Sequence, residues 1–472
     1  MTPTTPAPGR SRTRNAMIWI FGALGGILWG YDTGVISGAM LFIKQDIPLS
    51  PLQQGLVVSG LLVGAMAGAG ASGRLADAWG RRRLILWAAV VFTAGTVGAM
   101  LATTAWMLVA FRFVIGIGVG IASVVVPLYL TELAPKQSRG GLTSLMQLLV
   151  TIGILVAYVT DYALADSGAW RWMLGLGAVP AVLLGIGIYF QPESPRWLVK
   201  HGRADQAREV LTRLRGTGAE EVEQELDEIQ AADREKEAEN AVGVRELLTP
   251  RLRRVVLLGL GLVFFQNFIG INTIIYYAPT LLTTLGFGTS GAILANVGIG
   301  VVNVLMTLPA LRMIDRVGRK SLLAVGSIGM LVSMLVLGVA NVVGVSYGPL
   351  LVAVTLGSIL VYIASFAVSW GPVQWVMLPE LFPLRMRGSA VGICLVFNWL
   401  FNMAVALVFP VLLDITGPGV MFLFFALMAV LSFWFVQRGL IETKGKSLEA
   451  IEQEVLGTAD PAEPAEKQAA HA

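Results

Sequence analysis

The sequence predicts an all-α integral membrane protein with twelve transmembrane helices in two six-helix bundles. Charged residues make up only 14% of the 472-residue chain and hydrophobic residues 55%, whereas ordinary soluble domains are about 25% charged. The mean hydropathy of +0.72 agrees with a membrane protein. The chain also contains twelve apolar stretches close to the roughly 20 residues that span a bilayer. Finally, charged passages of the first half recur in the second, which indicates a duplicated membrane unit.

The twelve candidate spans form two groups of six, separated by one long polar insert. The spans lie near residues 17–40, 55–78, 84–104, 106–130, 141–163, 172–190, 254–284, 291–311, 321–341, 348–378, 388–413 and 419–437. Within the insert, 203–215 repeats apolar residues at helical spacing and 219–239 is rich in acids, which favours short cytoplasmic helices over a plain charged linker. We divide the chain into a disordered cytoplasmic tail (1–16), an N-terminal bundle (17–190), a linker (191–253), a C-terminal bundle (254–438) and a cytoplasmic tail (439–472).

The placement of Lys and Arg predicts that both termini are cytoplasmic. Basic residues gather in alternate short loops, whereas the opposite loops offer little beyond Lys44 and Arg171. The same bias explains the net charge of +4, so the composition gives no reason to expect a nucleic acid partner. The N-terminal tail leads into a full-length span, and we therefore expect no cleaved signal peptide. The single cysteine, Cys394, excludes an internal disulfide.

Two charged motifs occur once in each half of the chain. The first has Glu and Arg seven residues apart, and the second is Asp-x-x-Gly-Arg between two spans. A glycine turn leaves two helix ends facing each other, and Asp with Arg there can form charge networks that break when the halves move. A merely positive-inside turn would explain the Arg but not the Asp and Gly. We expect a cytoplasmic charge latch formed by Asp77, Arg81, Glu132 and Arg139 with Asp315, Arg319, Glu380 and Arg387.

These loops resemble the signature motifs of the sugar porter family within the major facilitator superfamily. The resemblance includes 192–198 (PESPRWL) after the sixth span and 442–445 (ETKG) after the twelfth, and it runs from about residue 20 to 446. It departs at Ile441, where the family usually has Pro. It implies the major facilitator fold, with two bundles that rock about a midplane site, and the transport of a monosaccharide across the cell membrane.

Asp32 is a carboxylate midway through the first span. An unpaired carboxylate there costs about 2.5–3.5 kcal/mol on insertion scales. We expect Arg112 in the fourth span to pair with it, because two charges at ~4 Å and an effective dielectric of ~20 attract by about 4 kcal/mol. By resemblance, proton-driven members carry Asp at this position, and animal facilitative glucose carriers carry Asn. We therefore expect Asp32 to take up a proton whose affinity Arg112 tunes; a static ion pair is the alternative.

Neutral amides and aromatic rings inside the spans indicate a site for a sugar, which presents hydroxyls and an apolar face. A single amide in a bundle more often holds helices together. By resemblance, the sugar-contacting positions are Gln147, Gln266, Asn272, Asn303, Trp375 and Asn398, and the gates and pocket wall comprise Tyr276, Tyr277, Gly371 and Trp399. We also expect Asn267 to contact the sugar; it stands where many members have Gln, and its shorter side chain leaves the identity of the sugar open. Gly270 and Gly371-Pro372 mark helices that can break.

The resemblance favours a proton-coupled symporter that imports D-glucose, because the amide and Trp set resembles that of bacterial glucose-proton symporters. Xylose, galactose, arabinose or a polyol as substrate, and a proton-independent uniporter, remain alternatives. A sugar sensor would be expected to carry a long signalling tail, and few residues follow Ser447. The two histidines, His201 and His471, lie in cytosolic segments without a nucleophile or metal-ligand cluster. We therefore expect no enzyme activity, no metal and no cofactor, only the proton gradient as driving force, and a monomer.

Overall fold

The computed structural model describes residues 8–134, 139–215, 219–238, 250–343, 349–382 and 387–446, which are helical apart from short turns and contain no strand. The N-terminal half contains α1 (Pro8–Asp46), α2 (Pro51–Trp79), α3 (Arg81–Met100), α4 (Ala105–Leu133), α5 (Arg139–Ala165), α6 (Trp170–Gly175) and α7 (Ala178–Tyr189). The C-terminal half contains α12 (Pro250–Phe268), α13 (Ile271–Thr284), α14 (Thr289–Val317), α15 (Arg319–Val342), α16 (Pro349–Val368), α17 (Trp370–Glu380) and α18 (Arg387–Gly439). The linker forms α8 (Pro195–Lys200), α9 (Ala204–Arg215) and α10 (Ala219–Ala238).

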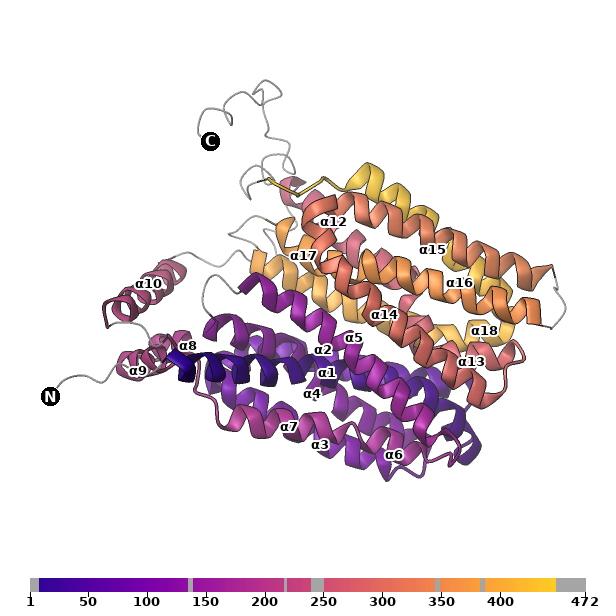
Figure 1. Cartoon of the computed structure of the whole chain (residues 1–472), viewed down its shortest axis with the longest axis horizontal. Helices are drawn as coiled ribbons and strands as arrows, with labels where there is room; N and C mark the ends of the chain where they lie inside the picture. The colour runs from indigo at the N-terminus through magenta and orange to yellow at the C-terminus, as the bar shows by residue number, and fades with distance from the viewer. Residues whose placement is uncertain are drawn as a thin grey trace, which may run out of the picture.

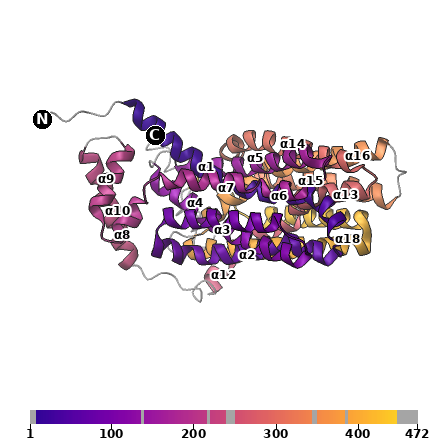
Figure 2. The same cartoon turned by 90° about the horizontal axis from the view of Figure 1, so that it is seen from below.

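The two halves lie side by side as separate helical bundles. In Figure 1 the bundle of α1–α7 lies below that of α12–α18, and the linker helices lie at the left end, beyond the bundles. Figure 2, seen from below, has the N-terminal bundle in front of the C-terminal one and the linker helices again at the left end. We call the end that carries the linker helices the linker end and the other the far end. The two helices predicted within the insert are present as α9 and α10.

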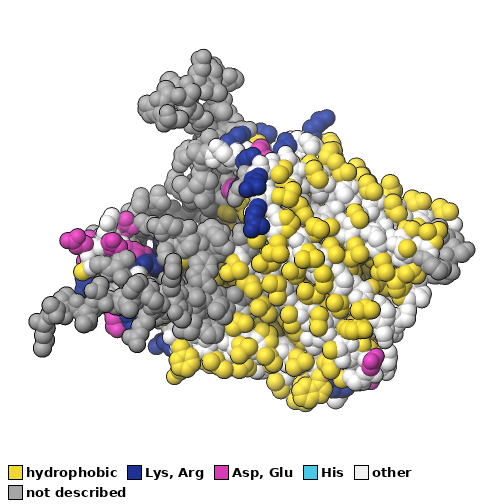
Figure 3. Space-filling view, viewed as in Figure 1, with side chains coloured by type: hydrophobic (Ala, Val, Ile, Leu, Met, Phe, Trp, Pro, Cys, Tyr) yellow, Lys and Arg dark blue, Asp and Glu magenta, His cyan; other side chains and the backbone are white. Residues whose placement is uncertain are grey.

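Eleven helices of the described residues are long and apolar enough to cross a membrane. The last of them contains two predicted spans, because α18 continues through Gly417, whose φ of 77° is not helical. Counting α18 as two, the described chain has the twelve spans that the sequence predicts. Figure 3 agrees with this arrangement, since hydrophobic side chains cover the helical body and most Lys and Arg lie toward the linker end.

Two element boundaries differ from the predictions. Helix α1 begins at Pro8, so residues 8–16, predicted as part of a disordered tail, are helical. The predicted sixth span is split into α6 and α7 at Leu176 and Gly177. Pro180 explains the split, because its ring lacks an N–H and clashes with the carbonyl four residues earlier, at Leu176. The C-terminal tail beyond residue 446 lies outside the described residues.

The two helix breaks that the sequence predicts near the middle of the membrane are present. Gly270, with a φ of 98°, separates α12 from α13 in the left-handed conformation that suits glycine. Ser369 separates α16 from α17. That break precedes Gly371, because Pro372 cannot donate a backbone hydrogen bond and disfavours helix at the residues before it. Each break leaves backbone groups and side chains free to face the centre of the protein.

A row of glycines brings α1 against α5. A methyl group added to Gly30 would meet the carbonyl oxygen of Val150 at 2.0 Å, and one added to Gly34 would meet that of Ile154 at 3.0 Å. The next glycine of the row, Gly38, faces Asp161 of α5. Only glycine permits this approach, because a residue without a side chain lets two helix backbones come close together. Because this face of α1 is occupied by α5, Asp32 points elsewhere, toward α4.

Candidate functional site

A cleft separates the two bundles toward the linker end. It has a volume of about 880 Å³ and is lined by the linker-end turns of α2, α12 and α18, together with part of α4. The lining is almost entirely apolar and small, with Ala69, Gly70 and Gly73 on one wall and Gly388 and Gly392 on the other. A solute entering from the linker end would therefore pass between the two halves of the molecule.

The far end is closed by contacts between the two halves. Asn296 of α14 donates a hydrogen bond to the Ser37 hydroxyl of α1 at 2.9 Å. Tyr158 of α5 donates to the carbonyl oxygen of Ile275 in α13 at 3.1 Å. The backbones of α2 and α18 also touch, since a methyl group on Gly55 would lie 2.4 Å from the carbonyl oxygen of Leu407. The molecule is thus open between its halves at the linker end and closed at the far end.

Asp32 and Arg112 form an ion pair inside the N-terminal bundle, as the sequence predicts. Arg112 Nη1 lies 2.7 Å from Asp32 Oδ1, and the side chains are 1% and 6% exposed. Arg112 Nε also donates to the carbonyl oxygen of Val57 at 3.4 Å. Asp32 Oδ2 is buried and has no hydrogen-bond partner among the described residues. One carboxylate oxygen is therefore held by the cation, while the other is left for a proton.

Amide side chains of the C-terminal half form a continuous hydrogen-bonded chain beside the break at Gly270. Asn272 donates to Asn267 Oδ1 at 2.9 Å, and Asn267 donates to Asn398 Oδ1 at 2.9 Å. Gln374 donates to the same oxygen of Asn398 at 3.3 Å. The chain connects α12, α13, α17 and α18 across both helix breaks. Asn267 and Gln374 are fully buried, so Asn267 acts by holding Asn272 and Asn398 in place.

Three tryptophans meet next to this amide chain. Trp29 of α1 lies with its ring centroid 5.6 Å from Trp399 and 6.2 Å from Trp375, edge-on to the latter. The contact joins the N-terminal half to the C-terminal half. Trp29 lies one helical turn before Asp32, about 4.5 Å away along the helix axis at 1.5 Å per residue. An aromatic platform and the buried ion pair are thereby positioned by the same stretch of α1.

The remaining predicted sugar positions also lie on helices that face the divide between the halves. Gln147 of α5 and Gln266 of α12 are half-buried, and Asn303 of α14 is buried. Among the described residues, none of these three side-chain amides has a hydrogen-bond partner in the protein. Their donors and acceptors are thus not used within the protein, in contrast to those of Asn267, and Gln147 and Gln266 are in addition partly exposed.

The predicted gate residues are fixed by hydrogen bonds to α18. Tyr277 donates to the carbonyl oxygen of Ala406 at 2.9 Å, and the Tyr276 hydroxyl accepts from Asn402 at 3.3 Å. Gly371 is buried beside Phe366, close to the break that begins α17. These contacts tie the far-end segment α13 to its own half.

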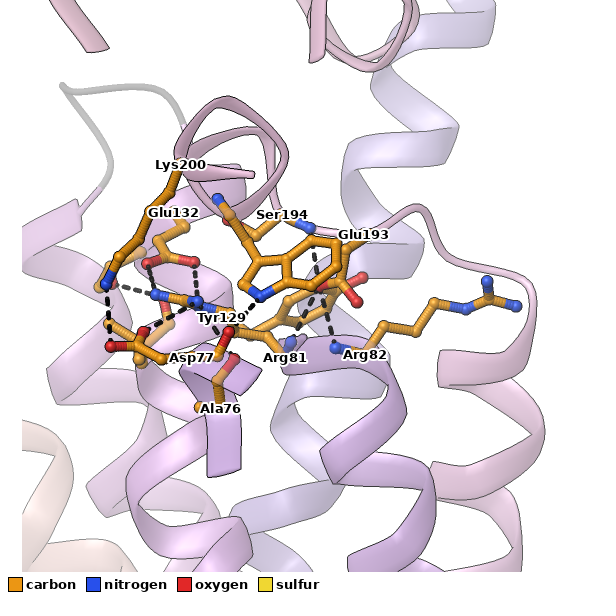
Figure 4. Close-up of polar contacts among 12 residues, drawn as sticks. Ala76, Asp77, Arg81, Arg82, Tyr129, Glu132, Glu193, Ser194 and Lys200 are labelled. Atoms are coloured by element: carbon orange, nitrogen blue, oxygen red, sulfur yellow. Dashed lines mark hydrogen bonds and ion pairs between the residues drawn. The ribbon is translucent and has the colours of Figure 1, made fainter. Parts of the chain in front are cut away.

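The predicted charge latch of the N-terminal half forms one cluster at the linker end (Figure 4). Arg81 pairs with Glu132 at 3.0 Å and with Asp77 at 3.3 Å. Lys200 of the linker helix α8 also pairs with Asp77, at 3.0 Å. Each of these ion pairs joins residues on the N-terminal side of the cleft, which fits a latch that is released while the linker end is open.

Glu193 completes this cluster by capping α3. Its Oε1 accepts from the backbone N–H groups of Arg81 and Arg82 at 3.0 and 3.1 Å. A carboxylate there is favourable because the first N–H groups of a helix lack intrahelical partners and carry partial positive charge. Gly80 makes the approach possible, since its φ is 93° and a methyl group on it would lie 2.4 Å from Glu193 Oε2.

The C-terminal half repeats this arrangement. Arg319 pairs with Glu380 at 3.2 Å. Glu442 accepts from the backbone N–H groups of Arg319 and Lys320 at 2.9 and 3.0 Å, across Gly318 with its φ of 105°. The side chains of the other predicted latch residues, Arg139, Asp315 and Arg387, lie outside the described residues. The duplicated sequence motif thus corresponds to a duplicated structure.

Sequence reasoning missed four residues of these sites. Trp29 precedes the stretch of the first span that contains Asp32, and its contact with the tryptophans of the other half depends on how the halves pack. Gln374 adjoins Trp375, and the direction of its amide depends on the helix break at Ser369. The role of Glu193 was hidden inside a motif whose capping partner is more than a hundred residues away. Asp161 was also missed, although it is a carboxylate within a predicted span, which is signal enough.

Two membrane-embedded helical bundles, a cleft between them and buried polar groups at their contact define a membrane transporter. A family model for sugar (and other) transporters matches residues 18–455. The chain therefore belongs to this family, the sugar porters of the major facilitator superfamily.

Individual relatives agree over nearly the whole chain. The chain is 49% identical over 441 residues to YwtG of Bacillus subtilis, a putative metabolite transport protein, covering 93% of this chain and 95% of the relative. It is 45% identical over 440 residues to the glucose transporter GlcP of Staphylococcus epidermidis, covering 93% and 97%. The structure of the proton:xylose symporter XylE bound to 6-bromo-6-deoxy-D-glucose matches with a TM-score of 0.75 and 32% identity, covering 94% of this chain and 99% of that chain.

Proposed function

We propose that this protein is a proton-coupled symporter that carries a monosaccharide, D-glucose in the first place, across the cell membrane by alternating access. The observation that carries the proposal is the buried Asp32–Arg112 pair, one helical turn from the Trp29 contact with the sugar-site tryptophans. A proton-binding group and a sugar-binding surface are thereby coupled through one rigid helix. The proton gradient supplies the driving force.

The chemistry of the central site supports a sugar as the substrate. The tryptophan rings offer an apolar face for a pyranose ring, and the amides of Gln147, Gln266 and Asn303 offer donors and acceptors for hydroxyl groups. The buried charges near the site, Asp32 and Arg112, neutralise one another. A neutral polyhydroxylated solute suits this surface better than an ion does.

The Asp32–Arg112 pair supports proton coupling. Protonation of Asp32 would cancel its charge and release Arg112, whose guanidinium keeps a backbone contact with Val57. Breaking a buried pair is unfavourable unless the remaining charge finds new partners, so proton uptake must be accompanied by rearrangement around α1 and α4. A uniporter of the same fold would have no need of an ionisable group at this place.

The open cleft supports alternating access. With both termini in the cytoplasm, as the positive-inside bias predicts, the linker end faces the cytoplasm and the structure represents an inward-facing state. The change to the outward-facing state would close the cleft that includes Gly73 and Gly388, and it would separate Ser37 from Asn296 at the far end. The charge clusters of the two halves would then meet, and each half would move as a body because its cluster is internally paired.

The choice of glucose follows the relative GlcP, whose name states that it transports glucose. The XylE structure supports testing a pentose beside the hexose, because that xylose symporter has a glucose derivative bound. Xylose, galactose, arabinose and a polyol are the alternatives that a substrate panel must separate.

Uptake into proteoliposomes tests the proposal. Labelled glucose is offered with and without an imposed inward proton gradient, in competition with each unlabelled sugar. We expect accumulation above equilibrium that a protonophore abolishes and that unlabelled glucose inhibits most strongly. Uptake that equilibrates and ignores the gradient would establish a uniporter, and the absence of uptake for every sugar would refute the substrate class.

A further inference from the structure

Asp161 is a second carboxylate inside the membrane-spanning part of the protein. It lies on α5 and is fully buried. Its Oδ2 accepts a hydrogen bond from the backbone N–H of Gly38 at 3.1 Å. Its Oδ1 is also buried and has no hydrogen-bond partner among the described residues. The glycine row lets α1 pack closely against α5, and the Asp161 carboxyl group therefore lies against the backbone of α1.

Asp161 differs from Asp32 in having no cation beside it. In the described chain, the buried Arg112 is held by Asp32, and Arg171 at the far end is held by Asp46. In the far-end half of the elements around Asp161, the titratable or charged side chains are Tyr31, Asp32, Lys44 and Asp46 of α1, Tyr158 and Tyr162 of α5, Arg112 of α4, Arg171 of α6, and Tyr276 and Tyr277 of α13. From α14 the neighbouring polar group is neutral, Asn296.

An ionised carboxylate that is buried without a neighbouring cation is unfavourable in free energy. Burial of an ionised group without a partner costs many kcal/mol, and such a group takes up a proton instead. The neutral acid satisfies the observed geometry, because Oδ2 remains an acceptor for Gly38 and Oδ1 is free to carry the proton. A buried acid of this kind inside a membrane bundle is a functional candidate.

The position of Asp161 connects it to the contacts that close the far end. Gly38 follows Ser37, the residue that binds Asn296 of the opposite half. Tyr158, one turn before Asp161 on α5, binds the backbone of Ile275 in the opposite half. When the halves separate at the far end, both contacts break and water gains access to the surface next to Asp161. The burial that keeps the acid neutral thus depends on the far end being closed.

We propose that Asp161 is a second proton-binding site, protonated while the far end is closed and able to ionise when it opens. Acid would then stabilise the closed far end, and alkali would favour its opening, independently of Asp32. The role of Asp161 in transport rests on the proposed function. The experiment that tests its protonation does not, because it needs neither a sugar nor a proton gradient.

The test compares Asp32→Asn with Asp32→Asn/Asp161→Asn, so that Asp32 contributes no titration. Spin labels are placed at Leu52→Cys and Ile415→Cys, which are 52% and 73% exposed on the far-end portions of α2 and α18. Cys394 is buried and stays unlabelled. The distance distribution in lipid nanodiscs is measured across a pH series. One proton changes a conformational equilibrium by at most about tenfold per pH unit.

In Asp32→Asn we expect the population with an open far end to rise with pH, by up to about tenfold per pH unit. In the double variant we expect this population to be independent of pH. Equal pH dependence in both proteins, or none in either, would overturn the inference. Asn at 161 keeps an acceptor for Gly38, so the double variant is expected to fold, which its helical circular dichroism and thermal unfolding midpoint verify. As an independent measurement, infrared spectroscopy of Asp32→Asn should show a protonated-acid carbonyl band that the double variant lacks; identical spectra would overturn the inference as well.

Discussion

Replacement of Asn267 by Ala tests how the amide chain supports the sugar site. Asn267 is fully buried and joins Asn272 to Asn398 through hydrogen bonds of 2.9 Å on either side. Alanine removes both bonds and leaves a small void between α12 and α18. Asn272 and Asn398 then lose the group that fixes their rotamers, although neither is itself changed.

The magnitude follows from the two bonds lost. Side-chain hydrogen bonds between membrane helices contribute about 0.6 kcal/mol on average and up to ~1.7 kcal/mol each. If the two amides must be reordered when the sugar binds, the loss is about 1–3 kcal/mol, which corresponds to roughly 5-fold to 150-fold weaker binding. The number of sugar hydroxyls contacted stays the same, because Asn267 itself is not accessible to the sugar.

Titration of the purified protein with glucose, followed by tryptophan fluorescence, measures this effect through Trp29, Trp375 and Trp399. Asn341→Ala is the matched control, because Asn341 is another intramembrane amide that donates to the backbone one turn earlier, at Leu337. The control should bind as the parent does. Affinity within twofold of the parent in Asn267→Ala would refute the idea that the amide chain orders the site.

Three further predictions concern proton coupling and the charge clusters. Asp32→Asn should reduce accumulation from up to about tenfold per pH unit of gradient to equilibrium, yet spare sugar exchange across vesicles; loss of both activities would refute its role. Among the described residues, Asp77 pairs only within its own half while the linker end is open, and the latch assigns its charge to contacts between the halves when that end closes; Asp77→Asn should therefore shift spectroscopic distances toward the open linker end, and an unchanged distribution would argue against a latch. Gly80→Ala forces a methyl group against Glu193 at a positive φ and should lower stability by about 1–3 kcal/mol, measured as a lower thermal midpoint than that of Gly70→Ala, where nothing lies within 4 Å.

The sequence was sufficient for features that depend on local chemistry. Gly270 and Pro372 predicted the broken helices. The pairing of Asp32 with Arg112 could be predicted from the free-energy cost of an unpaired carboxylate inside the membrane. Such a charge needs a partner of opposite sign, and the predicted spans contain few basic residues.

Features that depend on register between distant helices were not predictable. Asn267 was expected near the sugar, but the rotation of α12 at the break turns its amide toward Asn398. Glu193 caps α3 because α7 ends beside the Gly80 turn, a meeting that spacing along the chain does not reveal. Asp161 could have been noticed in the sequence, because it is a carboxylate within a predicted span. That no cation lies beside it, however, is visible only in the structure.

Proton-driven accumulation of sugar tests the central claim most directly. Proteoliposomes are loaded with labelled glucose at equilibrium across the membrane, and an inward proton gradient is then imposed. A symporter raises the internal glucose above the external concentration, and the rise collapses when a protonophore is added. Internal glucose that stays at the external concentration, in vesicles that exchange glucose freely, would contradict proton coupling.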